Sequence, residues 1–311
     1  MFKRVWIVLG MGLCLLAADP GGAHTGEVVV PIYELPTADL PDLHDGTLED
    51  WVEVLPEASL SHGDFLPILG PSINPGDLAF QIYLAWHGAS QRIYLAIERF
   101  DDRYINTYEG GQLEGLWAYD NVDFMVDGDH AGEQYNGFES SDAEELGFAE
   151  KDGRTNFAAQ QYFAIAAAPD RRLLGHPGLG LDWVTLPPFA DAGGFLLDSE
   201  PHISAIELYV TPWDGLDWSG PEQSVRSRLE AGRIIGMQIG VPDFDAEPGE
   251  YDGYYTIAGV AQSWRFANVF VDGLLVPCQG GDCGIVPERT AVQGDSWGRI
   301  KASFGKPPEF E

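Results

Sequence analysis

Apolar residues recur at every second position along most of this chain. In Leu78–Trp86 they alternate with small or polar residues, and the link His87–Gln91 (HGASQ) leads into a second alternating segment, Ile93–Glu98. Two such segments joined by a short link are typical of a β-hairpin. The same alternation predicts further strands at Val122–Val126, Gln160–Ala166, Ile203–Val210, Ile234–Val241, Val269–Leu275 and Trp297–Phe304. The pattern therefore predicts a chain that folds mainly into short strands.

One segment instead has the signals of a helix. Ser219 and Glu222 can form a capping box, and Pro221 suits an early helical position. Gly232 can end this helix. Many strands, Gly- and Pro-rich turns and a single helix predict an all-β fold, an antiparallel β-sandwich of jelly-roll type with long loops. Residues 138–200 have the least regular pattern, and we expect them to form extended surface loops.

The two ends of the chain lack the strand pattern. Lys3 and Arg4 precede the apolar run Val5–Ala18, which is too short to span a bilayer, and small residues follow it. Residues 1–23 are therefore typical of a signal peptide, with an uncleaved anchor as the alternative. We expect a secreted, periplasmic or cell-surface protein whose mature chain has no membrane span. We expect residues 24–44, which are rich in proline, to form a leader, residues 45–305 a single β-sandwich domain and residues 306–311 a tail.

The composition narrows the choice of partners and metals. The chain has 17 Lys and Arg residues against 49 Asp and Glu, a net charge of −32, which argues against nucleic acid and anionic membranes as partners. Solubility accounts for such a charge, and calcium binding by some of the carboxylates is the alternative. Cys278 and Cys283 are separated by four residues and can close a small disulfide in an oxidising compartment. Zinc is not expected, because a tetrahedral site needs four ligands and the chain has 3 cysteines in all.

Two acidic segments have the oxygen donors that calcium needs. Asp127, Asp129 and Glu133 lie in a loop with turn glycines, although this loop lacks the spacing of an EF-hand. Asp243 and Asp245 lie in the segment DFDAEPGEYD, which offers carboxylates in the same way. For both segments, an acidic turn that binds no metal is the alternative.

Six blocks of the sequence resemble, in order, motifs of the family 9 carbohydrate-binding modules and their DOMON-like relatives. They are Asp45–Trp51 (DGTLEDW), Gln91–Asp102 (QRIYLAIERFDD), Trp117–Asp129 (WAYDNVDFMVDGD), Ala205–Trp213 (AIELYVTPW), Ile235–Asp245 (IGMQIGVPDFD) and Gln262–Leu275 (QSWRFANVFVDGLL). Together the blocks cover most of residues 45–304. The resemblance implies a β-sandwich that binds carbohydrate.

The resemblance also implies roles for individual residues. Members of the family hold the end of a sugar chain between two tryptophan rings, and the matching positions here are Trp117 and Trp264. Asp123 matches the family's sugar-bonding glutamate, and strand alternation places it on the face opposite Val122. Flat aromatic rings can stack on the apolar faces of a sugar, and a carboxylate accepts strong hydrogen bonds from hydroxyl groups.

Two positions of the family pattern differ in this sequence. Phe163 stands where the family has a sugar-binding arginine. Ala261 stands where the family has an asparagine, and Gln262 is the nearest amide. The implied ligand-binding residues are Trp117, Asp123, Gln262 and Trp264, and the identity of the sugar does not follow from the resemblance.

These roles imply an exported, non-catalytic protein that binds an oligo- or polysaccharide. Three alternatives stay open. A glycoside hydrolase, or a protein associated with one, is the first, but it needs paired carboxylates across a cleft and nothing in the sequence singles out such a pair. A haem-binding electron-transfer module is the second, with Met125 as its candidate axial ligand, although haem is not favoured. A β-sandwich scaffold without a ligand is the third.

Overall fold

The computed structural model describes residues 28–55, 57–111, 115–135, 159–170, 173–176, 182–197, 200–217 and 220–278. These residues are mostly β-structure, with one short α-helix, α1 (Glu49–Val54). The strands are β1 (Val29–Glu34), β2 (Leu60–Ser61), β3 (Leu66–Leu69), β4 (Leu78–His87), β5 (Arg92–Asp101), β6 (Asn121–Asp127), β7 (Ala159–Ile165), β8 (Leu174–His176), β9 (Ala190–Leu197), β10 (His202–Val210), β11 (Trp213–Gly215), β12 (Val225–Arg226), β13 (Ile234–Asp243), β14 (Gly253–Thr256) and β15 (Val271–Val276). Short 3-10 helices are η1 (Thr37–Asp39), η2 (His62–Asp64), η3 (Leu116–Ala118), η5 (Asp182–Thr185) and η6 (Ala267–Val269).

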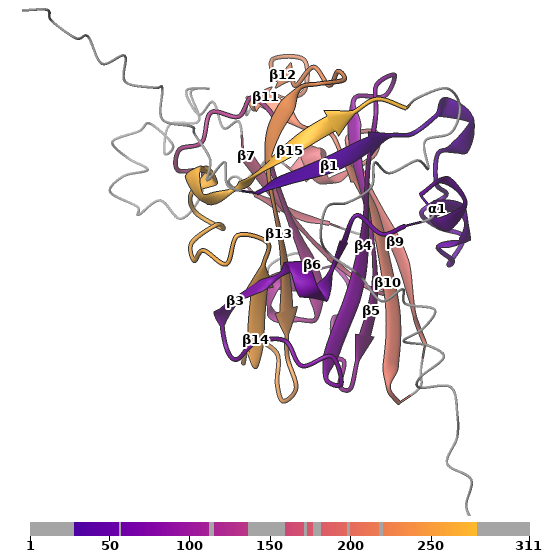
Figure 1. Cartoon of the computed structure of the whole chain (residues 1–311), viewed down its shortest axis with the longest axis vertical. Helices are drawn as coiled ribbons and strands as arrows, with labels where there is room; N and C mark the ends of the chain where they lie inside the picture. The colour runs from indigo at the N-terminus through magenta and orange to yellow at the C-terminus, as the bar shows by residue number, and fades with distance from the viewer. Residues whose placement is uncertain are drawn as a thin grey trace, which may run out of the picture.

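The strands form the two packed layers of a β-sandwich. In one layer the order is β8–β7–β6–β13–β15, with β14 and β3 continuing beside the far half of β13. In the other layer the order is β4–β5–β10–β9, with β2 beside β4. β1 runs parallel to both β15 and β4 and joins the two layers through hydrogen bonds. Figure 1 shows β4, β5, β9 and β10 on one side of the molecule and β6, β13 and β14 on the other.

The main hydrophobic core lies between the two layers. Phe80 and Leu84 of β4, Phe124 of β6 and Ile239 of β13 all contribute to it and are fully buried. Burying one such side chain stabilises the fold by roughly 1.5–3 kcal/mol, which is why every second residue of these strands is apolar. A second apolar cluster lies on the outer face of the β4–β5–β10 layer, where Trp51 of α1 packs.

Most of the predicted strands are confirmed. The predicted hairpin corresponds to β4 and β5, which pair antiparallel from Leu78 opposite Asp101 to His87 opposite Arg92. The alternating segments at residues 122–126, 160–166, 203–210, 234–241 and 269–275 correspond to β6, β7, β10, β13 and β15. Period-two alternation was a reliable signal here because each of these strands has one face in a core.

The helix predicted near residues 219–232 is wrong. In the described part of this segment, turns lead into β12, which pairs with β11. Ser227 N donates to the carbonyl of Pro212 at 3.0 Å, and Leu229 N donates to Oε1 of Gln91 at 2.6 Å. Because these backbone groups bond to distant partners, they are not available for helical bonds to the preceding turn. Tertiary contacts thus override the local capping signals.

Two segments that were expected to be irregular contain strands. Residues 24–44 were expected to form a leader, but they contain β1, whose Val30 and Ile32 lie in the main core. Residues 138–200 were expected to form loops, but they contain β9, which pairs with β10 along its length. Their sequences hid these strands because β1 contains a proline and β9 contains two adjacent glycines.

Several predictions fall on residues that the structure does not describe: the signal peptide at 1–23, the strand Trp297–Phe304, the tail at 306–311, and Cys283. Cys278 is disulfide-bonded. In the described ranges, no helix combines the length and the hydrophobicity that crossing a bilayer requires.

Candidate functional site

β6 presents polar side chains on the outer face of its layer. Val122, Phe124 and Val126 lie in the core, so Asp123 and Met125 point to the opposite face, as the alternation predicts. Met125, the candidate axial ligand of the haem alternative, is fully buried in a small apolar cluster with Tyr135, Ala159, Ala267 and Phe270.

Asp123 is 1% exposed, and three hydrogen bonds hold its carboxylate. Gln161 Nε2 on β7 donates to Oδ1 at 3.0 Å and to Oδ2 at 2.9 Å, and the hydroxyl of Tyr254 on β14 donates to Oδ2 at 2.5 Å. Burial raises the pKa of Asp123 to about 7, although the hydrogen bonds from Tyr254 and Gln161 act to lower it. The residue lies on the predicted face, but its neighbours cover it.

Tyr254 reaches Asp123 across a glycine of β13. Gly240 lies opposite Asp123 on one side and opposite Thr256 of β14 on the other. A Cβ atom at Gly240 would lie 2.5 Å from the hydroxyl oxygen of Tyr254. Any larger residue at this position would displace the tyrosine ring, so the contact between Tyr254 and Asp123 requires the glycine.

Trp117 lies in η3, just before β6, and is 44% exposed. The loop between β13 and β14 is hydrogen-bonded to the backbone of η3. Gly249 N donates to the carbonyl of Ala118 at 2.9 Å, and the hydroxyl of Tyr251 donates to the carbonyl of Trp117 at 3.4 Å. Tyr251 stacks on Tyr254, with ring centroids 5.8 Å apart. Two tyrosines therefore connect the backbone of Trp117 to the carboxylate below.

Trp264 lies in the loop before η6 and β15 and is 42% exposed. The hydroxyl of Tyr135 donates to the carbonyl of Ser263 at 2.7 Å, and Tyr135 N donates to the carbonyl of Arg265 at 3.0 Å. Burial and then the negative charge of Asp123 raise the pKa of Tyr135 well above its usual range. Tyr135 packs with Met125, two residues along β6 from Asp123. Both tryptophans that match the family's sugar-stacking positions are thus exposed, and a tyrosine hydroxyl bonds to the backbone at or next to each of them.

The other predicted or substituted positions have structural roles. Gln262 is exposed and has a positive φ of 71°, and its carbonyl accepts hydrogen bonds from Arg265 N at 2.9 Å and Phe266 N at 3.0 Å. Phe163, in place of the family's arginine, is buried with Leu116 and Ile165.

Two further buried polar groups were not predicted. Gln238 of β13 alternates with core residues and is fully buried opposite Met125. Its Oε1 accepts a hydrogen bond from Ile257 N at 3.1 Å, whereas its Nε2 has no hydrogen-bond partner among the described residues. Oγ of Ser263, beside Trp264, is also buried without a partner in the described part of the chain. Alternation could have placed Gln238 on the outer face, but only the strand register places it beside β6.

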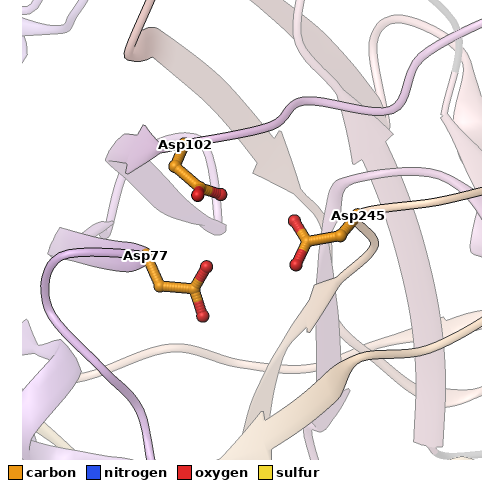
Figure 2. A group of neighbouring side chains, drawn as sticks. All are labelled: Asp77, Asp102 and Asp245. Carbon is orange, nitrogen blue, oxygen red and sulfur yellow. The ribbon is translucent and has the colours of Figure 1, made fainter.

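A second group of polar residues lies at one end of the sandwich. Asp77 precedes β4, Asp102 follows β5 and Asp245 follows β13, and a carboxylate oxygen of each lies within 4.8 Å of the others. Figure 2 shows the three carboxylates pointing toward one shared space. Burial, followed by the charges of Asp245 and Asp102, raises the pKa of Asp77 to about 6. This acidic cluster can hold a metal ion.

Arg99 lies next to the acidic cluster and is 2% exposed. Its guanidinium donates to Asp101 at 2.8 Å, to Asp120 at 2.6 Å and to Asp243 at 3.4 Å. Burial acts against the charge of Arg99, but these three carboxylates outweigh it and raise the pKa of the arginine. Asp243, a predicted calcium ligand, therefore contacts a guanidinium. Its carboxylate also lies within 4.8 Å of those of Asp101 and Asp245, so these three could hold a metal ion as well.

The first predicted calcium segment is arranged differently. Asp127 Oδ2 accepts a hydrogen bond from Gly132 N at 2.8 Å, and Asp129 Oδ1 accepts one from Ala131 N at 3.1 Å. Burial and the contact with Asp127 raise the pKa of Asp129 to about 7. Within the described ranges, the carboxylates of Asp127, Asp129 and Glu133 do not come close enough together to share a metal ion. Those of Asp243 and Asp245 do, together with Asp101.

Comparisons with known proteins identify the fold. No protein-family model matches the sequence, and no curated protein matches it. Among solved structures, the chain is similar to a family 9 carbohydrate-binding module (CBM9) from Caldicellulosiruptor kristjanssonii in complex with cellotriose, with a TM-score of 0.52 and 11% identity over 84% of this chain and 98% of that chain. It is also similar to a CBM9 from the same organism in complex with glucose, with a TM-score of 0.50 and 11% identity over 85% and 100% of the two chains. The chain therefore has the β-sandwich fold of the family 9 carbohydrate-binding modules.

Proposed function

We propose that this protein binds carbohydrate without catalysing a reaction and holds a sugar ring between the indoles of Trp117 and Trp264. The observation behind this proposal is that the two side chains are 44% and 42% exposed although tyrosines fix the backbone at both. Exposed indoles on a supported backbone are suited to stack on the apolar faces of a sugar. The CBM9 structures with cellotriose and glucose make glucose-based oligosaccharides the first ligands to test.

Two buried polar groups that lack partners in the described part of the chain support the same proposal: one is on the residue before Trp264, and the other is on the outer face of β13. Nε2 of Gln238 and Oγ of Ser263 are buried and lack hydrogen-bond partners among the described residues. A buried polar group without a partner costs about 1–3 kcal/mol, and a sugar hydroxyl that bonds to it would recover part of that free energy. A few polar groups beside aromatic side chains are the usual composition of a small-ligand site.

Asp123 is 1% exposed and is covered by its neighbours, which does not suit a carboxyl group that acts on a glycosidic bond. A glycosidase needs two carboxyl groups about 5–10 Å apart on either side of the scissile bond. The side chains that bond to Asp123 are the amide of Gln161 and the phenol of Tyr254. We infer a binding protein rather than an enzyme because the fold is that of the CBM9 modules. Its proposed export rests on the signal-peptide pattern of residues 1–23.

Isothermal titration calorimetry with cellotriose and glucose tests the binding site. We expect Trp117→Ala and Trp264→Ala each to weaken binding by about tenfold or more, a loss of about 1.4 kcal/mol. The matched control is Val52→Ala, which removes an apolar side chain that is 46% exposed on α1, over the other layer. If both tryptophan variants bind the sugars as tightly as the control does, the two indoles are not the binding site.

We also propose that the acidic cluster of Asp77, Asp102 and Asp245 binds Ca²⁺. Calcium is bound by oxygen ligands at about 2.3–2.6 Å, so two ligands of one ion lie at most about 5 Å apart. The three carboxylates meet this condition, with oxygens within 4.8 Å of one another. Oδ1 of Asp245 is buried without a hydrogen-bond partner in the described residues, which leaves it available to an ion.

Thermal unfolding with added CaCl₂ and after chelation tests the calcium proposal. An ion at 100 times its dissociation constant stabilises the folded state by about 2.7 kcal/mol, so we expect the melting temperature to rise with calcium. Asp245→Asn should remove this rise, whereas Asp39→Asn, an exposed residue of η1, should keep it. An equal calcium response in both variants would show that the ion binds elsewhere.

A further inference from the structure

We propose that Tyr135 is a positioning residue that sets the orientation of Trp264, an inference that rests on the proposed carbohydrate site. Tyr135 is 2% exposed, so we assign it no contact with a ligand. It acts through the backbone on both sides of Trp264. Its hydroxyl donates to the carbonyl of Ser263 at 2.7 Å, and its N–H donates to the carbonyl of Arg265 at 3.0 Å.

The contrast between Ser263 and Trp264 shows what these bonds achieve. Ser263 is 1% exposed, while the adjacent Trp264 is 42% exposed. The backbone is thus held in the interior at the residue before the exposed indole. Glu133, two residues before Tyr135, also contributes, because its carbonyl accepts a hydrogen bond from Ala267 N at 2.8 Å. The segment Glu133–Tyr135 therefore holds the Trp264 loop at its beginning and its end.

The loop needs such support because it begins in an unfavourable conformation. Gln262 has a φ of 71°, a region that residues other than glycine seldom adopt. A conformation of this kind persists only when the surrounding structure fixes it. The hydroxyl of Tyr135 bonds to the very next carbonyl, that of Ser263, and is placed to supply this constraint.

The ring of Tyr135 is anchored independently of its hydroxyl. It packs against Phe270 with ring centroids 5.8 Å apart and belongs to the same apolar cluster as Met125. Tyr135→Phe therefore removes the hydrogen bond to Ser263 and leaves the packing in place. Tyr162→Phe is a matched control, because Tyr162 is fully buried on β7 and its hydroxyl has no hydrogen-bond partner among the described residues.

Two measurements test the proposal. The first is the affinity for cellotriose by calorimetry, where we expect Tyr135→Phe to bind about fivefold or more weakly than wild type and Tyr162→Phe to bind like wild type. The second needs no sugar. It is the quenching of Trp264 fluorescence by acrylamide. The contribution of Trp264 is isolated by subtracting the fluorescence of the same protein that also carries Trp264→Phe. We expect Tyr135→Phe, and not Tyr162→Phe, to change this component.

The outcomes separate the two proposals. If the wild type binds no carbohydrate, the proposed function fails, and the quenching measurement still decides whether Tyr135 positions Trp264. If the wild type binds and Trp264→Ala weakens it, but Tyr135→Phe matches Tyr162→Phe in affinity and in quenching, the positioning role is overturned. Loss of affinity in Tyr135→Phe that is also found in Tyr162→Phe would equally overturn it, because it would show a general effect of losing a buried hydroxyl.

Discussion

Asp123 is a buried carboxylate whose described hydrogen-bond partners are all neutral. Gln161 and Tyr254 donate to it, whereas the buried carboxylates of Asp101 and Asp120 bond to the guanidinium of Arg99. Burial disfavours the charged form, and neutral donors offset this only in part, so the pKa of Asp123 rises to about 7. The stability of the protein should therefore depend on the ionisation of this one residue near neutral pH.

Asp123→Asn should remove that dependence. The pKa of Asp123 rises from an ordinary value of 3.8 to about 7 in the folded protein, so the wild type loses stability as the pH rises through this range. Below the range the carboxyl group is protonated in both states and contributes no ionisation penalty. We expect the free energy of unfolding of the variant minus that of the wild type to grow by a few kcal/mol between the two limits. Urea denaturation at pH 4 and pH 8 measures it, and a difference that does not change with pH would contradict this assignment.

Single residues were predictable where a local pattern decides their position. Alternation placed Asp123 on the outer face, and the motif resemblance selected Trp117 and Trp264, which are both exposed. The partners of Asp123 were not predictable, because Gln161 and Tyr254 come from strands whose register the sequence does not determine. The raised pKa follows from these partners and from burial, so it could not be predicted either.

At the scale of elements, α1 is fastened to the outer face of the β4–β5–β10 layer. Trp51 of α1 is 2% exposed, and its Nε1 donates to Oε2 of Glu207 on β10 at 2.8 Å. Burial, and after it the charges of Asp50 and Asp45, raise the pKa of Glu207 to about 8, while the bond from Trp51 acts to lower it. The contact between helix and strand thus includes a carboxyl group that resists ionisation.

Glu207→Gln should stabilise this contact at high pH. The amide keeps an oxygen that accepts from Trp51 but has no proton to lose. The pKa of Glu207 rises from 4.5 to about 8 in the folded protein. Ionising the buried carboxyl group therefore costs the wild type no stability below this pH range and its full free energy above it. We expect the variant to exceed the wild type in free energy of unfolding by a few kcal/mol at pH 9 and by little at pH 4.5. The control is Glu222→Gln, because Glu222 is exposed. If the free energies of unfolding of the two variants change equally with pH, the role of Glu207 is refuted.

Helices and strands were predictable where residues close together in the sequence determine their conformation. The β4–β5 hairpin was predictable because both strands bury one face and a short link joins them. The helix near residues 219–232 was not, because Gln91 and the carbonyl of Pro212 bind the backbone that a helix would use. β1 was missed because its proline interrupts the strand signal.

At the scale of the molecule, the loop between β13 and β14 connects the two candidate sites. It contains Asp245 of the acidic cluster, and its Gly249 and Tyr251 bond to the backbone of η3. α1 covers the outer face of one layer, while Asp123 and Gln238 belong to the outer face of the other. The acidic cluster lies at one end, where β4 begins and β5 and β13 end. The order of six motifs was enough to predict the sandwich, but Asp77 and Asp102 came together with Asp245 only through the packing of the layers.

The most direct test of the central claim is a crystal structure of the protein with cellotriose. We predict a glucose ring between the indoles of Trp117 and Trp264. A sugar bound at any other surface, with both indoles free, would contradict the account.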